Sequence, residues 1–156
     1  MSQSDTQSIE GFYVAGISKV TSNENDRAAE DINALWQQFY ESDILHKIPN
    51  RAENVIYAVY NDYEGDHTKP YRVTLGCKID GTPDDLPEGL HKIHVPSADY
   101  MIFAARGEQP KSLLETWATV WKSDIKRSYA ADLEIYGPRF FEEGLHEILV
   151  CVGVKI

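Results

Sequence analysis

Cysteine, long apolar runs and positive charge are all scarce in this sequence. It has two cysteines, Cys77 and Cys151, which lie far apart in apolar segments with the character of strands. This usage is typical of buried thiols in a reducing cytosol and argues against a disulfide framework. No segment approaches the apolar length that spans a membrane, and the polar beginning MSQSDTQSIEG lacks the basic start and apolar core of a signal peptide. We therefore expect a cytoplasmic protein with no membrane partner.

The shortage of positive charge also bears on partners. Lys and Arg number 15 against 25 Asp and Glu, which gives a formal net charge of −10. Proteins that bind the nucleic-acid backbone need clustered Lys and Arg to displace counterions. The balance therefore argues against direct nucleic-acid binding and mildly favours cationic partners, which a negative surface potential concentrates.

Motifs for metals, nucleotides and nucleophilic catalysis are missing as well. The sequence has no CxxC, HExxH or glycine-rich phosphate loop. His91 and His94, in LHKIH, fall on opposite faces of a predicted strand, so they cannot easily share a metal. Neither cysteine has an evident activating base. We expect no metal and no cofactor.

What the sequence does contain is an internal repeat. The segments LWQQFYESDI (35–44) and TWATVWKSDI (116–125) align without gaps, and VTLGCKI (73–79) aligns in the same order with VCVGVKI (150–156). The alignment places two of the three tryptophans opposite each other. The aligned aromatic pairs are Trp36 with Trp117 and Tyr40 with Trp121.

The order of predicted elements is the same in both halves. Aromatic and β-branched runs indicate strands, and apolar residues at helical spacing indicate two amphipathic helices. We predict strands over 11–20, 54–63, 71–80, 90–95, 98–107, 132–137 and 147–156, and helices over about 24–43 and 110–126. In the strand 71–80, Tyr71, Val73, Leu75, Cys77 and Ile79 alternate onto one face.

These patterns predict an α+β fold built from duplicated β-α-β-β units with pseudo-twofold symmetry and antiparallel sheets. The length of 156 residues and the hydrophobic fraction of 42% suit one domain with a substantial core. We assign residues 1–10 to a flexible leader and 11–156 to a single domain, with repeats at about 11–80 and 98–156. Each helix must bury its apolar stripe against its own sheet, so a groove between the halves is the expected ligand site.

Glu134 is the main candidate for a functional residue. It lies in the strand segment DLEIYG, where Glu134 and Tyr136 share one face. A carboxylate buried without a partner is costly, and burial should raise its pKa, so a lipophilic cation would relieve the cost. The alternative is that Glu134 lies on the solvent face of the sheet.

Aromatic residues at corresponding positions of the two halves are the second candidate element. Aromatic faces attract cations and can bury flat ligands without exact polar complementarity. The alternative for each is ordinary core packing. The residues concerned are Trp36, Tyr40, Tyr57, Trp117, Trp121 and Tyr136.

With its duplicated units, the segments VPSADYMIFAARG (95–107) and LEIYGP (133–138), and the tryptophans of the second helix, the chain resembles the GyrI-like small-molecule-binding domain. That family includes the effector-binding domains of AraC-type and BmrR-type transcription regulators. The resemblance implies a groove for hydrophobic, frequently cationic molecules with a buried glutamate on its floor. No helix-turn-helix accompanies the domain in this sequence, so we expect a stand-alone multidrug- or effector-binding protein, with or without a partner regulator.

Two other functions fit the resemblance. In the first, the protein hydrolyses electrophilic small molecules, with Glu134 as general base on water and Tyr57 or Tyr136 as hydrogen-bond donor; turnover with saturation kinetics would identify it. In the second, it binds gyrase as the gyrase-inhibiting members do, which a supercoiling assay would test. The edge strands of such a fold would also permit a homodimer.

Overall fold

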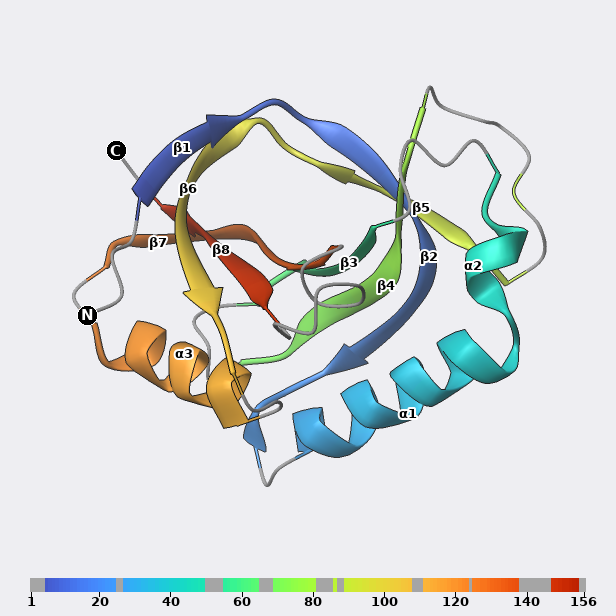
Figure 1. Cartoon of the computed structure of the whole chain (residues 1–156), viewed down its shortest axis with the longest axis horizontal. Coiled ribbons are helices and arrows are strands. Elements are labelled where there is room, and N and C mark those ends of the chain that lie inside the picture. The colour runs from blue at the N-terminus through green and yellow to red at the C-terminus, as the bar shows by residue number, and fades with distance from the viewer. Residues whose placement is uncertain are drawn as a thin grey trace.

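The computed structural model places eight strands in one antiparallel sheet, with helices α1 and α3 on the same side of it (Figure 1). The described residues are 5–24, 27–49, 55–64, 69–80, 86, 89–107, 111–123, 125–137 and 147–154. The strands are β1 (Asp5–Ile9), β2 (Phe12–Thr21), β3 (Ile56–Asn61), β4 (Tyr71–Ile79), β5 (His91–Val95), β6 (Ala98–Ala105), β7 (Arg127–Tyr136) and β8 (Ile148–Val154). The helices are α1 (Arg27–Glu41), α2 (Ile44–Lys47) and α3 (Lys111–Lys122).

The strand order reads symmetrically from the middle of the sheet outward. It is β1-β6-β8-β7-β3-β4-β2-β5, so the unit β2-α1-β3-β4 is matched by the unit β6-α3-β7-β8. The two units meet where β3 pairs antiparallel with β7, for example Ala58 opposite Glu134. The predicted α+β fold of duplicated β-α-β-β units is therefore confirmed.

The two edge strands are exchanged between the halves. The strand β1 precedes the first unit but pairs with β6 of the second, whereas β5 precedes the second unit and pairs with β2 of the first. The interpretation of residues 1–10 as a flexible leader is therefore wrong for Asp5–Ile9, which form β1. Their sequence, DTQSI, has almost no apolar content, because an edge strand with one neighbour buries little side-chain surface.

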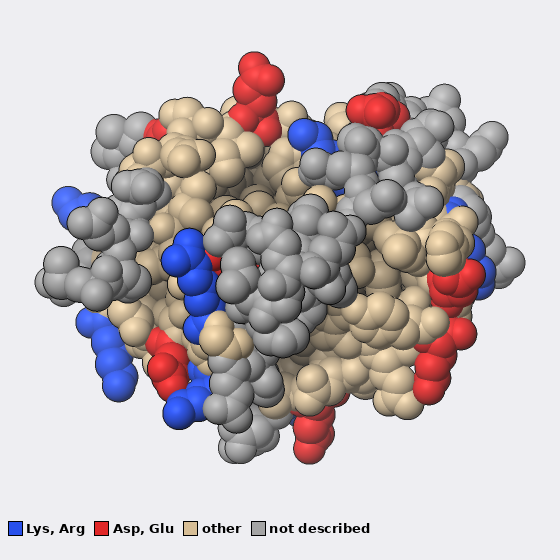
Figure 2. Space-filling model, viewed as in Figure 1, with Lys and Arg blue, Asp and Glu red and all other residues tan. Residues whose placement is uncertain are grey.

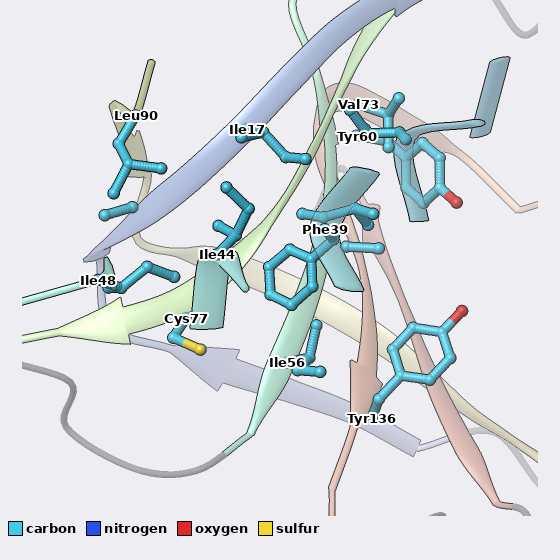
Figure 3. Packing of buried hydrophobic residues seen from close by; sticks show 14 of the residues in the cluster. Ile17, Phe39, Ile44, Ile48, Ile56, Tyr60, Val73, Cys77, Leu90 and Tyr136 are labelled. Carbon is cyan, nitrogen blue, oxygen red and sulfur yellow. The ribbon is translucent and has the colours of Figure 1, made fainter. Parts of the chain in front are cut away.

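The largest hydrophobic cluster lies between the helices and the sheet (Figure 3). The alternating residues predicted for one face of β4 all belong to this cluster, which confirms that pattern. They are Tyr71, Val73, Leu75, Cys77 and Ile79. The opposite face of the sheet carries a second cluster, which includes Val14, Tyr57, Val59 and Leu133. The sheet is therefore apolar on both faces, and neighbouring residues of β3 contribute to different clusters.

The two helices differ in how far their apolar stripes are buried. Leu35 and Phe39 of α1 are buried as predicted, and so is Val120 of α3. In contrast, Leu114 and Trp121 of α3 are 61% and 42% exposed, so the prediction of a fully packed stripe is wrong there. The short helix α2 was also not predicted. Predicted positions 25, 26, 54, 110, 124, 155 and 156 lie outside the described residues.

Two glycines allow β2 and β4 to approach closely. Gly16 and Gly76 face each other in the ladder, and a Cβ added to Gly76 would lie 2.0 Å from the carbonyl oxygen of Ala15. A Cβ on Gly153, the repeat partner of Gly76, would lie 2.6 Å from the carbonyl oxygen of Ala131. In both repeats, the glycine therefore lies where a side chain would clash with the backbone of a neighbouring strand.

The surface shows no single charged region on the face drawn in Figure 2, where acidic and basic side chains are dispersed among uncharged ones. None of the described helices has the length and apolar content needed to cross a membrane.

Candidate functional site

A cavity of about 660 Å³ lies between α1 and α3 and reaches the helix-facing side of β3, β4 and β7. Both repeats contribute to it, so the groove expected between the halves is present. Its lining is mostly aromatic, with Trp36, Tyr40, Tyr60, Tyr63, Tyr71, Trp117, Trp121 and Tyr136. The exposed side chains of Tyr40, Leu114 and Trp121 belong to this lining, which explains why they do not pack on the sheet.

Glu134 lies on the floor of the cavity and is only 3% exposed. Its Oε2 accepts hydrogen bonds from the Tyr60 hydroxyl at 2.9 Å and from the Trp117 indole Nε1 at 2.7 Å. Its Oε1 accepts one from the Tyr136 hydroxyl at 2.7 Å. Figure 3 shows the hydroxyl ends of Tyr60 and Tyr136 on the same side of the cluster. The prediction that Glu134 lies inside rather than on the solvent face is confirmed.

The carboxylate of Glu134 is held by hydrogen bonds from neutral donors. No salt bridge within the described part of the chain involves Glu134. Burial raises the pKa of Glu134 above its ordinary value of 4.5, and the hydrogen bonds from Tyr136, Trp117 and Tyr60 lower it in part. The cavity floor therefore holds a carboxyl group for which ionisation is costly.

The surrounding phenols stay protonated. Burial, followed by the charge of Glu134, raises the pKa of Tyr60 and of Tyr136 well above 10 and that of Tyr71 to about 12. At neutral pH the hydroxyls of Tyr60 and Tyr136 therefore act as donors to the carboxylate, which is the role that their hydrogen bonds require.

The aromatic rings form a continuous wall on each side of Glu134. On the α1 side, Trp36 stands edge-on to Tyr136 at 4.9 Å between centroids and stacks on Tyr40 at 5.8 Å. On the α3 side, Trp117 stands edge-on to Tyr60 at 5.7 Å. Such tilted contacts fix the rings and leave other ring surface facing the cavity.

Sequence reasoning found most of these residues but chose the wrong tyrosine of β3. Of the seven side chains predicted for the groove, six line the cavity, and Tyr57 does not. Tyr57 pairs with Ile135 and belongs to the hydrophobic cluster on the opposite face, so its prediction is wrong. Tyr60 takes its place. It lies two residues after Ala58, whose partner across the ladder is Glu134, so Tyr60 and Glu134 share a face.

Arg127 is a lining residue that sequence reasoning missed entirely. It begins β7, is 8% exposed, and its Nη2 lies 2.6 Å from Oδ2 of the fully buried Asp132. The predicted strand began only at residue 132, so no signal placed Arg127 in the sheet.

The raised pKa of Glu134 predicts a stability that falls with rising pH. Between 4.5 and the raised pKa, the folded protein binds a proton at Glu134 that the unfolded chain has released, so the free energy of unfolding decreases as pH increases. Urea denaturation of the wild type and of Glu134→Gln at a series of pH values from 4.5 upward would measure this. The wild type should lose stability relative to the variant through this range and then reach a plateau. Parallel pH profiles would contradict the assignment.

Comparison with known proteins gives a consistent result. A family model described as integron-associated effector binding protein matches residues 7–152, whereas no protein with a curated description matches. Among solved structures, an integron cassette protein from the mobile metagenome of Vibrio cholerae is 27% identical, with a TM-score of 0.73 over 97% of this chain and 95% of the other.

Two further structures share the fold at lower identity. The protein SAV2435 bound to tetraphenylphosphonium is 18% identical, with a TM-score of 0.79 over 98% of this chain and 94% of that one. A bacterial transcription regulation protein described as putative, from Staphylococcus aureus MU50, is also 18% identical, with a TM-score of 0.74 and 99% of both chains covered. The resemblance to GyrI-like effector-binding domains is thus confirmed, and with nearly its whole length matched, the chain belongs to the family of integron-associated effector-binding proteins.

Proposed function

We propose that this protein binds hydrophobic organic cations in the aromatic cavity, with Glu134 as the partner of the positive charge. The observation that carries the proposal is a carboxylate that is 3% exposed on the floor of an apolar cavity. Among the described residues, it receives hydrogen bonds from neutral donors only. A cation in the cavity would supply an opposite charge to the carboxylate. It would thereby offset the cost of burying that charge, which favours cations over neutral ligands.

The walls suit a ligand of this kind. Ring faces within about 6 Å of a cation contribute on the order of 0.5–2 kcal/mol, more when water is excluded. Tyr40, Leu114 and Trp121 leave apolar surface exposed at the cavity, and an aromatic ligand would cover it. Rings on both sides impose little directional constraint, which favours broad rather than narrow specificity.

The comparisons support the same chemistry. The matching family is described as effector-binding, and tetraphenylphosphonium, the ligand named for SAV2435, is a lipophilic aromatic cation. We infer that the effectors of this protein belong to the same chemical class.

A pair of xanthene dyes of opposite charge tests the proposal. All three tryptophans lie on α1 and α3 and line the cavity, so a bound dye should quench their fluorescence. At pH 8, cationic rhodamine 6G should quench saturably and at least tenfold more tightly than anionic fluorescein. Equal affinities would contradict a charge-selective site, and no saturable quenching by either dye would contradict the cavity as a ligand site.

A further inference from the structure

The cavity has a second charged lining residue whose sign is opposite to that of Glu134. Among the described residues that line it, only Glu134 and Arg127 carry charge. A site for cations would gain nothing from a positive wall, so the presence of Arg127 needs a reason that the proposed function does not give.

Arg127 lines the cavity and is held in place by an ion pair. Its Nη2 contacts Oδ2 of Asp132 at 2.6 Å, and Asp132 is fixed in turn by the Gly153 N–H at 2.9 Å and by the Tyr63 hydroxyl. Asp132 is fully buried and is not a lining residue, whereas Arg127 is. The positive end of this ion pair therefore lies nearer to a ligand than the negative end.

The same aromatic ring connects the two charges. The Arg127 guanidinium carbon lies 5.9 Å from the ring centroids of both Trp117 and Tyr63. The Nε1–H of that same Trp117 donates to Glu134 at 2.7 Å. The positive and the negative group therefore contact the same indole, Arg127 over its ring and Glu134 at its Nε1–H.

We propose that Arg127 determines the specificity of the site by selecting ligands with one positive centre and, about one ring away, a carboxylate or another hydrogen-bond acceptor. The charges of Glu134, Arg127 and Asp132 sum to −1, which balances one positive charge. A second positive group on the ligand would be repelled by Arg127, because charges in the cavity are poorly screened. A hydrogen-bond acceptor at the same place would be attracted to Arg127. This inference rests on the proposed function, since it concerns the second pole of the same cavity.

Rhodamine 6G and its free acid, rhodamine 19, form a matched pair of probes. They share the xanthylium cation and differ only in an ethyl ester against a carboxylate on the pendant ring. Their dissociation constants would be measured at pH 8 by dye anisotropy for the wild type and for Arg127→Met/Asp132→Asn. The double variant removes both charges, because removing Arg127 alone would leave Asp132 as an unpaired buried carboxylate. In the variant, the affinity for rhodamine 19 relative to rhodamine 6G should fall at least fivefold.

Glu134→Gln provides the control that separates the two claims. It should weaken both dyes by a similar factor and leave their ratio as in the wild type. If both dyes bind and the ratio is unchanged in the double variant, this inference is overturned and the proposed function stands. If neither dye binds the wild type, both are overturned. If circular dichroism shows that the double variant does not fold, Arg127→Lys is measured instead. This variant keeps the positive charge, so it should keep the wild-type ratio of the two dye affinities. Loss of that ratio would overturn a role based on charge.

Discussion

Replacing Glu134 with Gln should weaken the binding of rhodamine 6G at least tenfold, which is about 1.4 kcal/mol or more. Gln keeps the size of the side chain but removes the charge. Its carbonyl oxygen can accept from Tyr60 and Trp117 while its NH2 group donates to the Tyr136 hydroxyl, which can act as donor or acceptor. If the ligand cation is bound mainly because the buried carboxylate lacks an opposite charge, the loss should appear in affinity and not in folding. Titration followed by tryptophan fluorescence measures it directly.

A buried glutamate outside the cavity supplies the matched control. Glu147 is 5% exposed and paired with Arg106, and it is not among the lining residues. Glu147→Gln should therefore bind rhodamine 6G as the wild type does. Affinity unchanged in Glu134→Gln, or reduced equally in both variants, would show that the cavity carboxylate is not the charge partner.

Replacing Gly76 with Ala should strongly destabilise the sheet. The added Cβ would lie 2.0 Å from the backbone oxygen of Ala15 and 2.9 Å from the Cα of Gly16, and no side-chain movement can relieve contacts with backbone. We expect a loss of at least about 3 kcal/mol in the free energy of unfolding, the upper end of the usual overpacking range. For a chain of this length, the melting temperature should fall by roughly 10 °C. Urea denaturation and thermal melting would measure both quantities.

Gly137→Ala makes the same chemical change without the same clash. The nearest heavy atom to its added Cβ is Cγ2 of Val55 at 3.9 Å, an ordinary contact. This variant should stay within about 0.5 kcal/mol of the wild type, as substitutions away from special features do. If Gly76→Ala is equally mild, the close approach of β2 and β4 is not what requires the glycine.

Most of the fold could be predicted because its signals are local and duplicated. Trp36 aligns with Trp117, and apolar residues alternate strictly over Tyr71–Ile79. Both patterns reflect which side chains are buried, and their spacing can be read directly from the sequence. Strand β1 could not be found this way. Its pairing with β6, more than ninety residues away in the chain as in Asp5 opposite Ile102, leaves no trace in the five residues DTQSI.

The site was predictable to the extent that its residues lie on helices with a clear apolar stripe. Trp36 and Trp117 follow from the stripe, and Glu134 stands out as a carboxylate in an apolar strand. The choice of Tyr57 over Tyr60 was wrong because a shift of one residue moves a strand side chain to the other face, and no local signal fixes that register. Arg127 could not be placed, because its partner Asp132 lies across an irregularity in the β7–β8 ladder that occurs between these two residues.

The exchange of edge strands also has a consequence for how the molecule is made. Since β1 completes the second half and β5 completes the first, neither half can close before the chain has been synthesised well past its midpoint. Contacts of such high sequence separation slow folding, and they make the two halves a single cooperative unit. During synthesis, the outer edges of β2 and β3 would therefore stay unpaired until β5 and β7 have been made and can pair with them.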